Sequence, residues 1–146
     1  MRFWDTSAIV PLVVREAATE TVQGWLRDDP DIALWGLTWV ELASAVERRV
    51  REGRIPQSSR RPILQRLARI AGDAHEISDI AAVRSRAVPL LARHALRAAD
   101  ATQLGAALLI ADPDPSTLTM VVLDHRLAIS AEREGLVVLT WPEPSV

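Results

Sequence analysis

Short apolar runs alternate with helix-like stretches along the chain, and this alternation limits the folds it can adopt. Strands that alternate with helices favour a mainly parallel sheet in an α/β fold, with helices packed on the sheet. We therefore predict an α/β fold in which residues 1–146 form a single domain. The strand-length runs are 2–5 (RFWD), 32–37 (IALWGL), 75–78 (HEIS), 118–123 (LTMVVL) and 136–139 (LVVL).

The segments between these runs have the spacing and the end signals of helices. Pro11 is acceptable only in the first turn of a helix, since proline lacks the N–H that later turns need. The stretch IPQSSRRP reads as a turn-rich connection whose serines cap a helix starting at Pro62. The predicted helices are 7–14, 18–29, 38–53, 62–72, 78–96, 97–111 and 124–135.

Composition excludes several classes of protein. The chain has no cysteine, so disulfide frameworks and thiolate metal sites are excluded. No apolar run is long enough to cross a membrane, and no signal-like start is present, so we expect a cytoplasmic protein without membrane contact. All 17 basic residues are arginine, and biased genome composition is the favoured explanation. Six of these arginines lie within residues 47–61, either as a solvated face or as contacts to an RNA backbone.

Four acidic residues stand where a parallel sheet would bring them to one edge. Asp5 ends the first apolar run, and Asp124 follows the run before the last helix. Glu41 lies in the first turn of one helix, and Asp100 lies near the start of an alanine-rich helix. Ligands of such folds bind at the carboxyl ends of the strands, so we expect the four side chains to meet there. Four like charges need a cation, and oxygen ligands without cysteine favour Mg²⁺ or Mn²⁺.

Each acid taken alone also fits the role of a helix cap. Asp5 could cap a helix that starts near Thr6, and Asp124 could cap the helix DHRLAISAE that it begins. Glu41 forms a capping-box pattern with Thr38, and Asp100 heads the cap-like sequence DATQ. Capping is the commoner role for a single acid, but the joint placement of four acids beside apolar segments favours a metal site. A metal ion there would activate water for hydrolysis of a phosphodiester.

The chain resembles the PIN-domain nucleases, and among them the small VapC-like toxins of type II toxin–antitoxin systems. Four stretches carry the resemblance, in this order and at these separations: WDTSAIV, TWVELASAV, LRAADATQLGAAL and VVLDHRLAISAEREGL. The resemblance covers nearly the whole chain. It implies a three-layer α/β/α sandwich, endoribonuclease activity that depends on Mg²⁺ or Mn²⁺, a cognate antitoxin and a homodimer. The apolar stretches of the helices within residues 17–52 either form the dimer interface or belong to the core.

The resemblance also implies roles for individual residues. The hydroxyl next to the first acid falls on Thr6 or Ser7, where it would steady the Asp5 carboxylate or a bound water. We assign Thr6, Ser7 and Arg97 to substrate binding. Relatives often carry a threonine two residues before the fourth acid, whereas this chain has Val122. The implied metal ligands and catalytic residues are Asp5, Glu41, Asp100 and Asp124.

Two other functions compete with a nuclease. A phosphatase of the haloacid-dehalogenase kind also uses an aspartate after its first strand, but it needs a second aspartate where this chain has Ser7, and a lysine, which this chain lacks. The other alternative is a non-catalytic PIN-like module that binds RNA or protein. That module would show no metal-dependent cleavage, and its RNA affinity would not depend on the acids.

Overall fold

Five parallel strands form one sheet in the order β3-β2-β1-β4-β5. This architecture comes from a computed structural model that describes residues 1–142, so residues 143–146 of the predicted domain lie outside the described part. The predicted parallel sheet is confirmed, with strands somewhat shorter than the apolar runs that contain them. The strands are β1 (Arg2–Trp4), β2 (Ile32–Trp35), β3 (His75–Ile77), β4 (Thr119–Val121) and β5 (Val137–Leu139).

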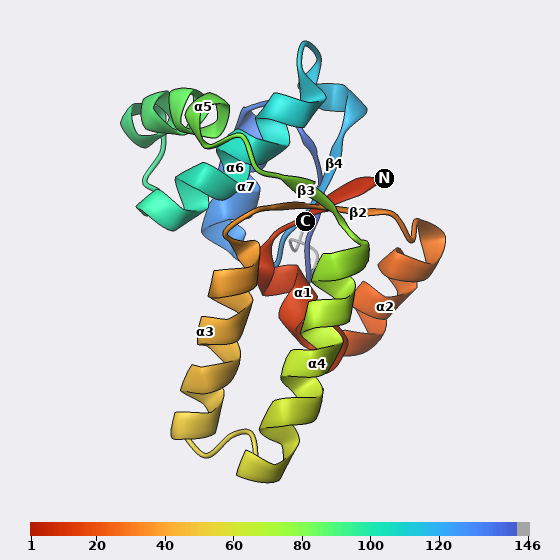
Figure 1. Ribbon diagram of the computed structural model, residues 1–146. Helices are drawn as coiled ribbons and strands as arrows, with labels where there is room; N and C mark the ends of the chain where they lie inside the picture. Colours follow the sequence, from red (N-terminus) through yellow and green to blue (C-terminus); the bar gives the residue numbers. More distant parts are fainter. Residues whose placement is uncertain (143–146) are drawn as a thin grey trace.

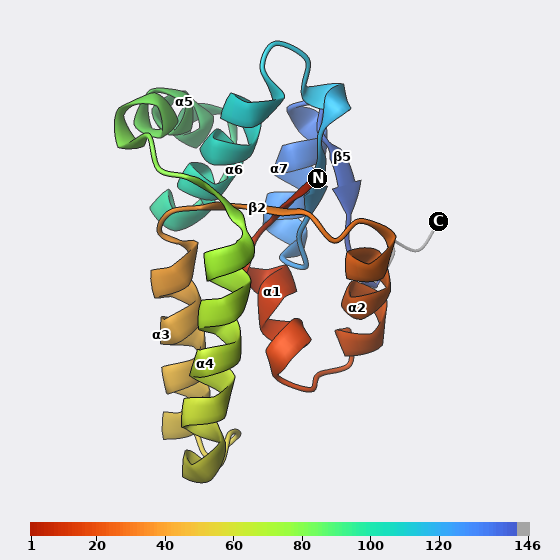
Figure 2. The ribbon, with the colours of Figure 1, turned by 45° about the vertical axis from the view of Figure 1, so that its right-hand side comes forward.

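Helices cover both faces of the sheet and give three layers. Figure 1 shows α1 to α4 below the strands and α5 to α7 to their left and upper left, and Figure 2 shows the same groups of helices after a turn. The predicted α/β/α sandwich is thus confirmed. The first layer contains α1 (Thr6–Val13), α2 (Thr19–Asp28), α3 (Thr38–Arg51) and α4 (Gln57–Asp73). The second contains α5 (Ile80–Arg93), α6 (Ala98–Ala111) and α7 (His125–Arg133), with a short 3₁₀ helix, η1 (Pro115–Thr117), before β4.

Side chains of the strands alternate between two cores, as the geometry of a strand requires. Phe3 and Met120 belong to the core under α5 to α7, whereas Trp4 and Val121 belong to the core under α1 to α4. All four are fully buried. This double burial explains why the strands read as continuous apolar runs, as is usual for parallel sheets.

Two helix predictions near prolines are wrong. Pro11 occupies the sixth position of α1, beyond the first turn. Helix α4 starts at Gln57 rather than Pro62, so Ser59 lies inside the helix instead of capping it. Packing overrides the proline cost in both places: α1 is almost entirely buried, and Leu67 of α4 is buried in the core shared with α3.

The topology places the first and fourth acids side by side. Strand β1 lies between β2 and β4, and Trp4 is in register with Val121. The backbone N–H of Asp5 donates to the carbonyl of Val121 at 3.0 Å. Because all strands run in the same direction, the segments that lead into α1, α3 and α7 leave the same edge of the sheet. Among residues 1–142, no helix is both long and apolar enough to traverse a bilayer.

Candidate active site

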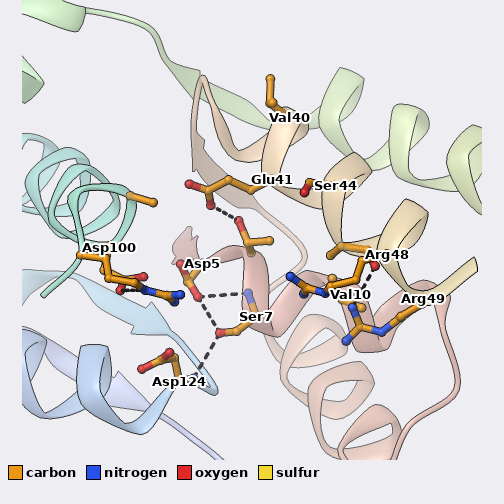
Figure 3. A pocket seen from close by; sticks show the side chains of 14 residues that line it. Asp5, Ser7, Val10, Val40, Glu41, Ser44, Arg48, Arg49, Asp100 and Asp124 are labelled. Atoms are coloured by element: carbon orange, nitrogen blue, oxygen red, sulfur yellow. Dashed lines mark hydrogen bonds and ion pairs between the residues drawn. The ribbon is translucent and has the colours of Figure 1, made fainter. Parts of the chain in front are cut away.

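Side chains of all four predicted acids line one pocket at this edge of the sheet. The pocket has a volume of about 560 Å³. Figure 3 shows the acids projecting toward the pocket from α3, α6 and the segments that follow β1 and β4. The structure therefore brings together residues up to 119 positions apart in the chain, from Asp5 to Asp124. The predicted substrate-binding residues Thr6, Ser7 and Arg97 line the same pocket.

Asp5 is the most buried of the four acids, with 5% of its surface exposed. Its Oδ2 accepts two hydrogen bonds from Ser7, one from the backbone N–H at 3.0 Å and one from the hydroxyl at 2.5 Å. Asp5 is thus the N-cap of α1, as its capping interpretation predicted. Burial raises the pKa of Asp5 to about 6, the charges of Glu41 and Asp100 add to the rise, and the Ser7 hydrogen bonds oppose it.

The Ser7 hydroxyl also binds the backbone at Asp124, the fourth acid. Its Oγ accepts from the backbone N–H of Leu123 at 2.9 Å and from that of Asp124 at 3.3 Å. Val122 is fully buried in the core under α5 to α7 and does not line the pocket. Ser7 therefore positions the backbone at Asp124 without a hydroxyl at position 122.

Glu41 is held by neutral donors from two other helices. Its Oε2 accepts from the Thr6 hydroxyl at 2.5 Å and from the Gln103 side-chain amide at 2.8 Å. The capping-box interpretation of Glu41 and Thr38 is wrong, because Leu37 is the N-cap of α3 and no side chain caps it. The carboxylate turns toward the pocket instead, since donors of α1 and α6 hold it there.

The other two acids have partners close in sequence. Asp100 accepts from Nε of Arg97 at 3.3 Å, and the Arg97 side chain is 77% exposed. Asp100 is the third residue of α6 and caps nothing, so its capping interpretation is wrong. Asp124 is the N-cap of α7, and its Oδ1 accepts from the N–H of Leu127 at 3.0 Å.

The donor chemistry of the pocket suits a hard divalent cation. Each of the four carboxylates uses one oxygen for a protein partner, and its other oxygen has no hydrogen bond to any residue in 1–142. Within that range, however, no three acidic or histidine side chains are already arranged around one point. In this arrangement Asp100 pairs with Arg97 and Asp124 caps its own helix, so a cation bound by all four acids would require these two side chains to reorient.

Basic residues flank the acids on both sides. Arg48 and Arg49 of α3 line the main pocket beyond Glu41 (Figure 3). Arg49 pairs with Glu16, whereas Arg48 is exposed and forms no ion pair within the described chain. On the other side, a smaller pocket shares Arg97 and two acids with the first and adds His125 and Arg126. An acidic centre between arginines can hold an ion while binding phosphates on either side.

Sequence reasoning missed two residues of this site. Gln103 was not singled out, although a buried amide in the apolar helix α6, three residues after an acid, is a signal that points to it. Arg126 was also missed, because a single arginine on a helix carries no signal of its own. The arginines of residues 47–61 were noted, and two of them, Arg48 and Arg49, line the pocket.

Comparisons with known proteins identify the family. The family model of the PIN domain matches residues 2–118, which include three of the four acids. FitAcB from Neisseria gonorrhoeae is similar in structure, with a TM-score of 0.67, 18% identity, and coverage of 95% of this chain and 96% of that one. VapC20 from Mycobacterium tuberculosis, described as a sarcin–ricin loop cleaving toxin, is similar with a TM-score of 0.66 and 17% identity. The match covers 94% of this chain and 97% of that one.

A toxin–antitoxin complex from Klebsiella pneumoniae is similar as well, with a TM-score of 0.63, 17% identity, and coverage of 86% of this chain and 88% of that one. No curated protein sequence matches the chain. At such low identities the solved structures show a shared fold, whereas the family model matches most of the sequence. The acids at the carboxyl edge of the sheet, the three-layer fold and this match agree that the chain belongs to the PIN domain family.

Proposed function

We propose that this chain is a Mg²⁺- or Mn²⁺-dependent endoribonuclease that acts as the toxin of a toxin–antitoxin pair. The observation that carries the proposal is the meeting of four carboxylates in one pocket. Membership of the PIN family supports nuclease chemistry. The likeness to VapC20, a toxin that cleaves the sarcin–ricin loop, and to the toxin–antitoxin complex from Klebsiella pneumoniae supports a toxin that acts on RNA.

The four carboxylates would hold the ion through the oxygens that have no protein partner. Carboxylate oxygens are the ligands that Mg²⁺ and Mn²⁺ prefer. A bound ion of this kind lowers the pKa of a coordinated water and so supplies the nucleophile for phosphodiester hydrolysis. The protein residues do the positioning: Ser7 fixes Asp5 and the backbone at Asp124, and Thr6 fixes Glu41.

RNA would cross the acids between the two groups of arginines. Arg48 lies seven residues after Glu41 on α3, so their Cα atoms are about 10 Å apart along the helix axis. A side chain at that position can reach a phosphate neighbouring the one that is cleaved. Arg97 and Arg126 are placed to bind phosphate on the opposite side. Arginine suits this role because its guanidinium matches phosphate oxygens in two-point contacts.

Cleavage of a total-RNA sample tests the proposal. The purified protein is compared with Mg²⁺, with Mn²⁺ and with EDTA, beside Asp5→Asn and Asp100→Asn, which remove a ligand charge with little change of shape. We expect metal-dependent cleavage that falls by at least about 100-fold in both variants, since each removes charge from the site. Asp79→Ala is the matched control, because Asp79 caps α5 outside the pocket and its loss tests capping alone.

The other outcomes identify the competing function. Cleavage in EDTA, or equal cleavage by wild type and both variants, would contradict a metal site at these acids. Absence of cleavage together with RNA binding that both variants retain would instead support a non-catalytic PIN-like binding module.

The antitoxin and the homodimer belong to the same proposal. The similar structure from Klebsiella pneumoniae is a toxin–antitoxin complex, and this supports a protein partner for the present chain. The structures of FitAB and of VapBC2 from Rickettsia felis, which are also similar, contain DNA fragments. Co-expression with the product of the neighbouring small gene should abolish cleavage. Light scattering during size-exclusion chromatography should give twice the chain mass of 16.1 kDa.

A further inference from the structure

Gln103 is a buried polar residue in an otherwise apolar helix. It lies on α6 three residues after Asp100, so the two side chains emerge on neighbouring turns of the same face. Only 1% of its surface is exposed. Its Oε1 has no hydrogen-bond partner within residues 1–142, which makes Gln103 a costly choice for a position that an apolar side chain could fill.

The amide nitrogen of Gln103 reaches three acceptors on two other helices. It lies 2.8 Å from Oε2 of Glu41, 2.9 Å from the Thr38 hydroxyl and 3.2 Å from the Thr6 hydroxyl. An ionised carboxylate only accepts hydrogen bonds, so the NH₂ group and not the carbonyl must face Glu41. This contact fixes the orientation of the amide.

The contact determines which oxygen of Glu41 is available. Oε2 receives both the Gln103 amide and the Thr6 hydroxyl, while Oε1 receives no hydrogen bond from the described residues. One oxygen is therefore anchored and the other is left for the pocket. The same amide joins α6, which carries Asp100, to α3 and to α1, which begins immediately after Asp5.

We propose that Gln103 is a positioning residue that holds Glu41 as a one-oxygen ligand and sets the spacing of the acids around the cation. This inference rests on the proposed function, since it concerns the same site. Partners of ligand side chains commonly decide metal affinity in this way, and their loss weakens it by about 10- to 100-fold. The unpaired Oε1 is then the stability cost of placing an NH₂ group at this point.

The test is a titration of the protein with Mn²⁺ alone. Electron paramagnetic resonance measures the concentration of free Mn²⁺ at each step and so gives the binding affinity. Gln103→Met keeps the length of the side chain and removes the donor, and we expect it to weaken Mn²⁺ binding by about 10- to 100-fold. Gln103→His restores an N–H donor and should recover most of that loss. Leu104→Val is the matched control, because Leu104 is the fully buried neighbour on α6, belongs to the core under α5 to α7 and has no side-chain group that can donate to Glu41.

Each result decides a separate question. Mn²⁺ affinity of Gln103→Met within about twofold of wild type, or an equal loss in Leu104→Val, would overturn the positioning role. If Gln103→Met does not fold, Gln103→His decides alone, and about tenfold weaker binding by that folded variant would overturn the role. Absence of Mn²⁺ binding by the wild-type protein would instead overturn the proposed function on which this role rests.

Discussion

The two halves of the acidic pocket are held in different ways. In the first half, Asp5 and Glu41 accept hydrogen bonds from hydroxyl and amide groups, including two from other helices. In the second half, Asp100 pairs with the exposed Arg97, and Asp124 caps its own helix. The first half is held by neutral donors alone, whereas the second half also contains an exposed ion pair.

The two kinds of partner differ in their effect on the negative charge of the acids. Neutral donors orient a carboxylate without cancelling its charge, so the pKa of Asp5 stays raised, chiefly by burial and to a smaller extent by the charges of Glu41 and Asp100. Arg97 does cancel charge in the second half, but through an exposed pair that is easily broken. Under the proposed function, Asp100 would have to turn away from Arg97 before it could bind a cation with the first half.

Asp5→Asn should have the largest effect on the stability of the metal-free protein. The pKa of Asp5 rises from 3.8 to about 6 on folding, so its contribution to stability is complete below about pH 4 and is lost as the pH rises through 6. With each unit of pKa corresponding to about 1.4 kcal/mol, ionised Asp5 costs roughly 3 kcal/mol near neutral pH. Asparagine keeps the oxygen that accepts from Ser7 and carries no charge.

Urea unfolding in EDTA at several pH values measures this effect. The variant should be more stable than wild type by roughly 3 kcal/mol above about pH 7, and the two should converge below about pH 4. If the difference in free energy of unfolding between variant and wild type does not change with pH, ionised Asp5 does not destabilise the folded state. A variant less stable than wild type at neutral pH would lead to the same conclusion.

Ser7→Ala should have the next largest effect, because one hydroxyl serves both halves. The change removes a donor to Asp5 and leaves the partly buried backbone N–H groups of Leu123 and Asp124 without the Ser7 hydroxyl as their acceptor. We expect a loss of roughly 2 kcal/mol in the free energy of unfolding. Ser44→Ala is the control, since Ser44 is an exposed residue of the same pocket. Equal losses in the two variants would mean that Ser7 does not join the halves.

Arg97→Gln should have the smallest effect on stability, below about 1 kcal/mol, because Arg97 is 77% exposed. The variant should nevertheless bind Mn²⁺ a few-fold more tightly, because the guanidinium that competes with Mn²⁺ for Asp100 is gone. It should also reduce the salt dependence of RNA binding by about one phosphate contact. Isothermal titration and binding at several salt concentrations measure the two effects. Arg133→Gln, an exposed arginine of α7 outside both pockets, should change neither; weaker Mn²⁺ binding by Arg97→Gln would contradict competition.

Much of the fold and the meeting of the acids could be predicted from the sequence, because both follow from local patterns. Short apolar runs predicted the strands, and parallel strands bring Asp5 and Asp124 to the same edge. The start of α4 could not be predicted, since tertiary packing of Leu67 outweighs the local signal of Pro62. The partners of Glu41 could not be predicted either, because Gln103 is 62 residues away in sequence.

A crystal structure with Mn²⁺, located by anomalous scattering, tests the central claim most directly. A cation site built from these acids predicts one or more Mn²⁺ peaks in the pocket, bound by Asp5 and by Oε1 of Glu41, with Asp100 turned away from Arg97. The hydrogen bond between Gln103 and Glu41 should persist. A structure in which Mn²⁺ binds elsewhere, or in which all four acids keep only their protein partners at saturating Mn²⁺, would contradict the claim.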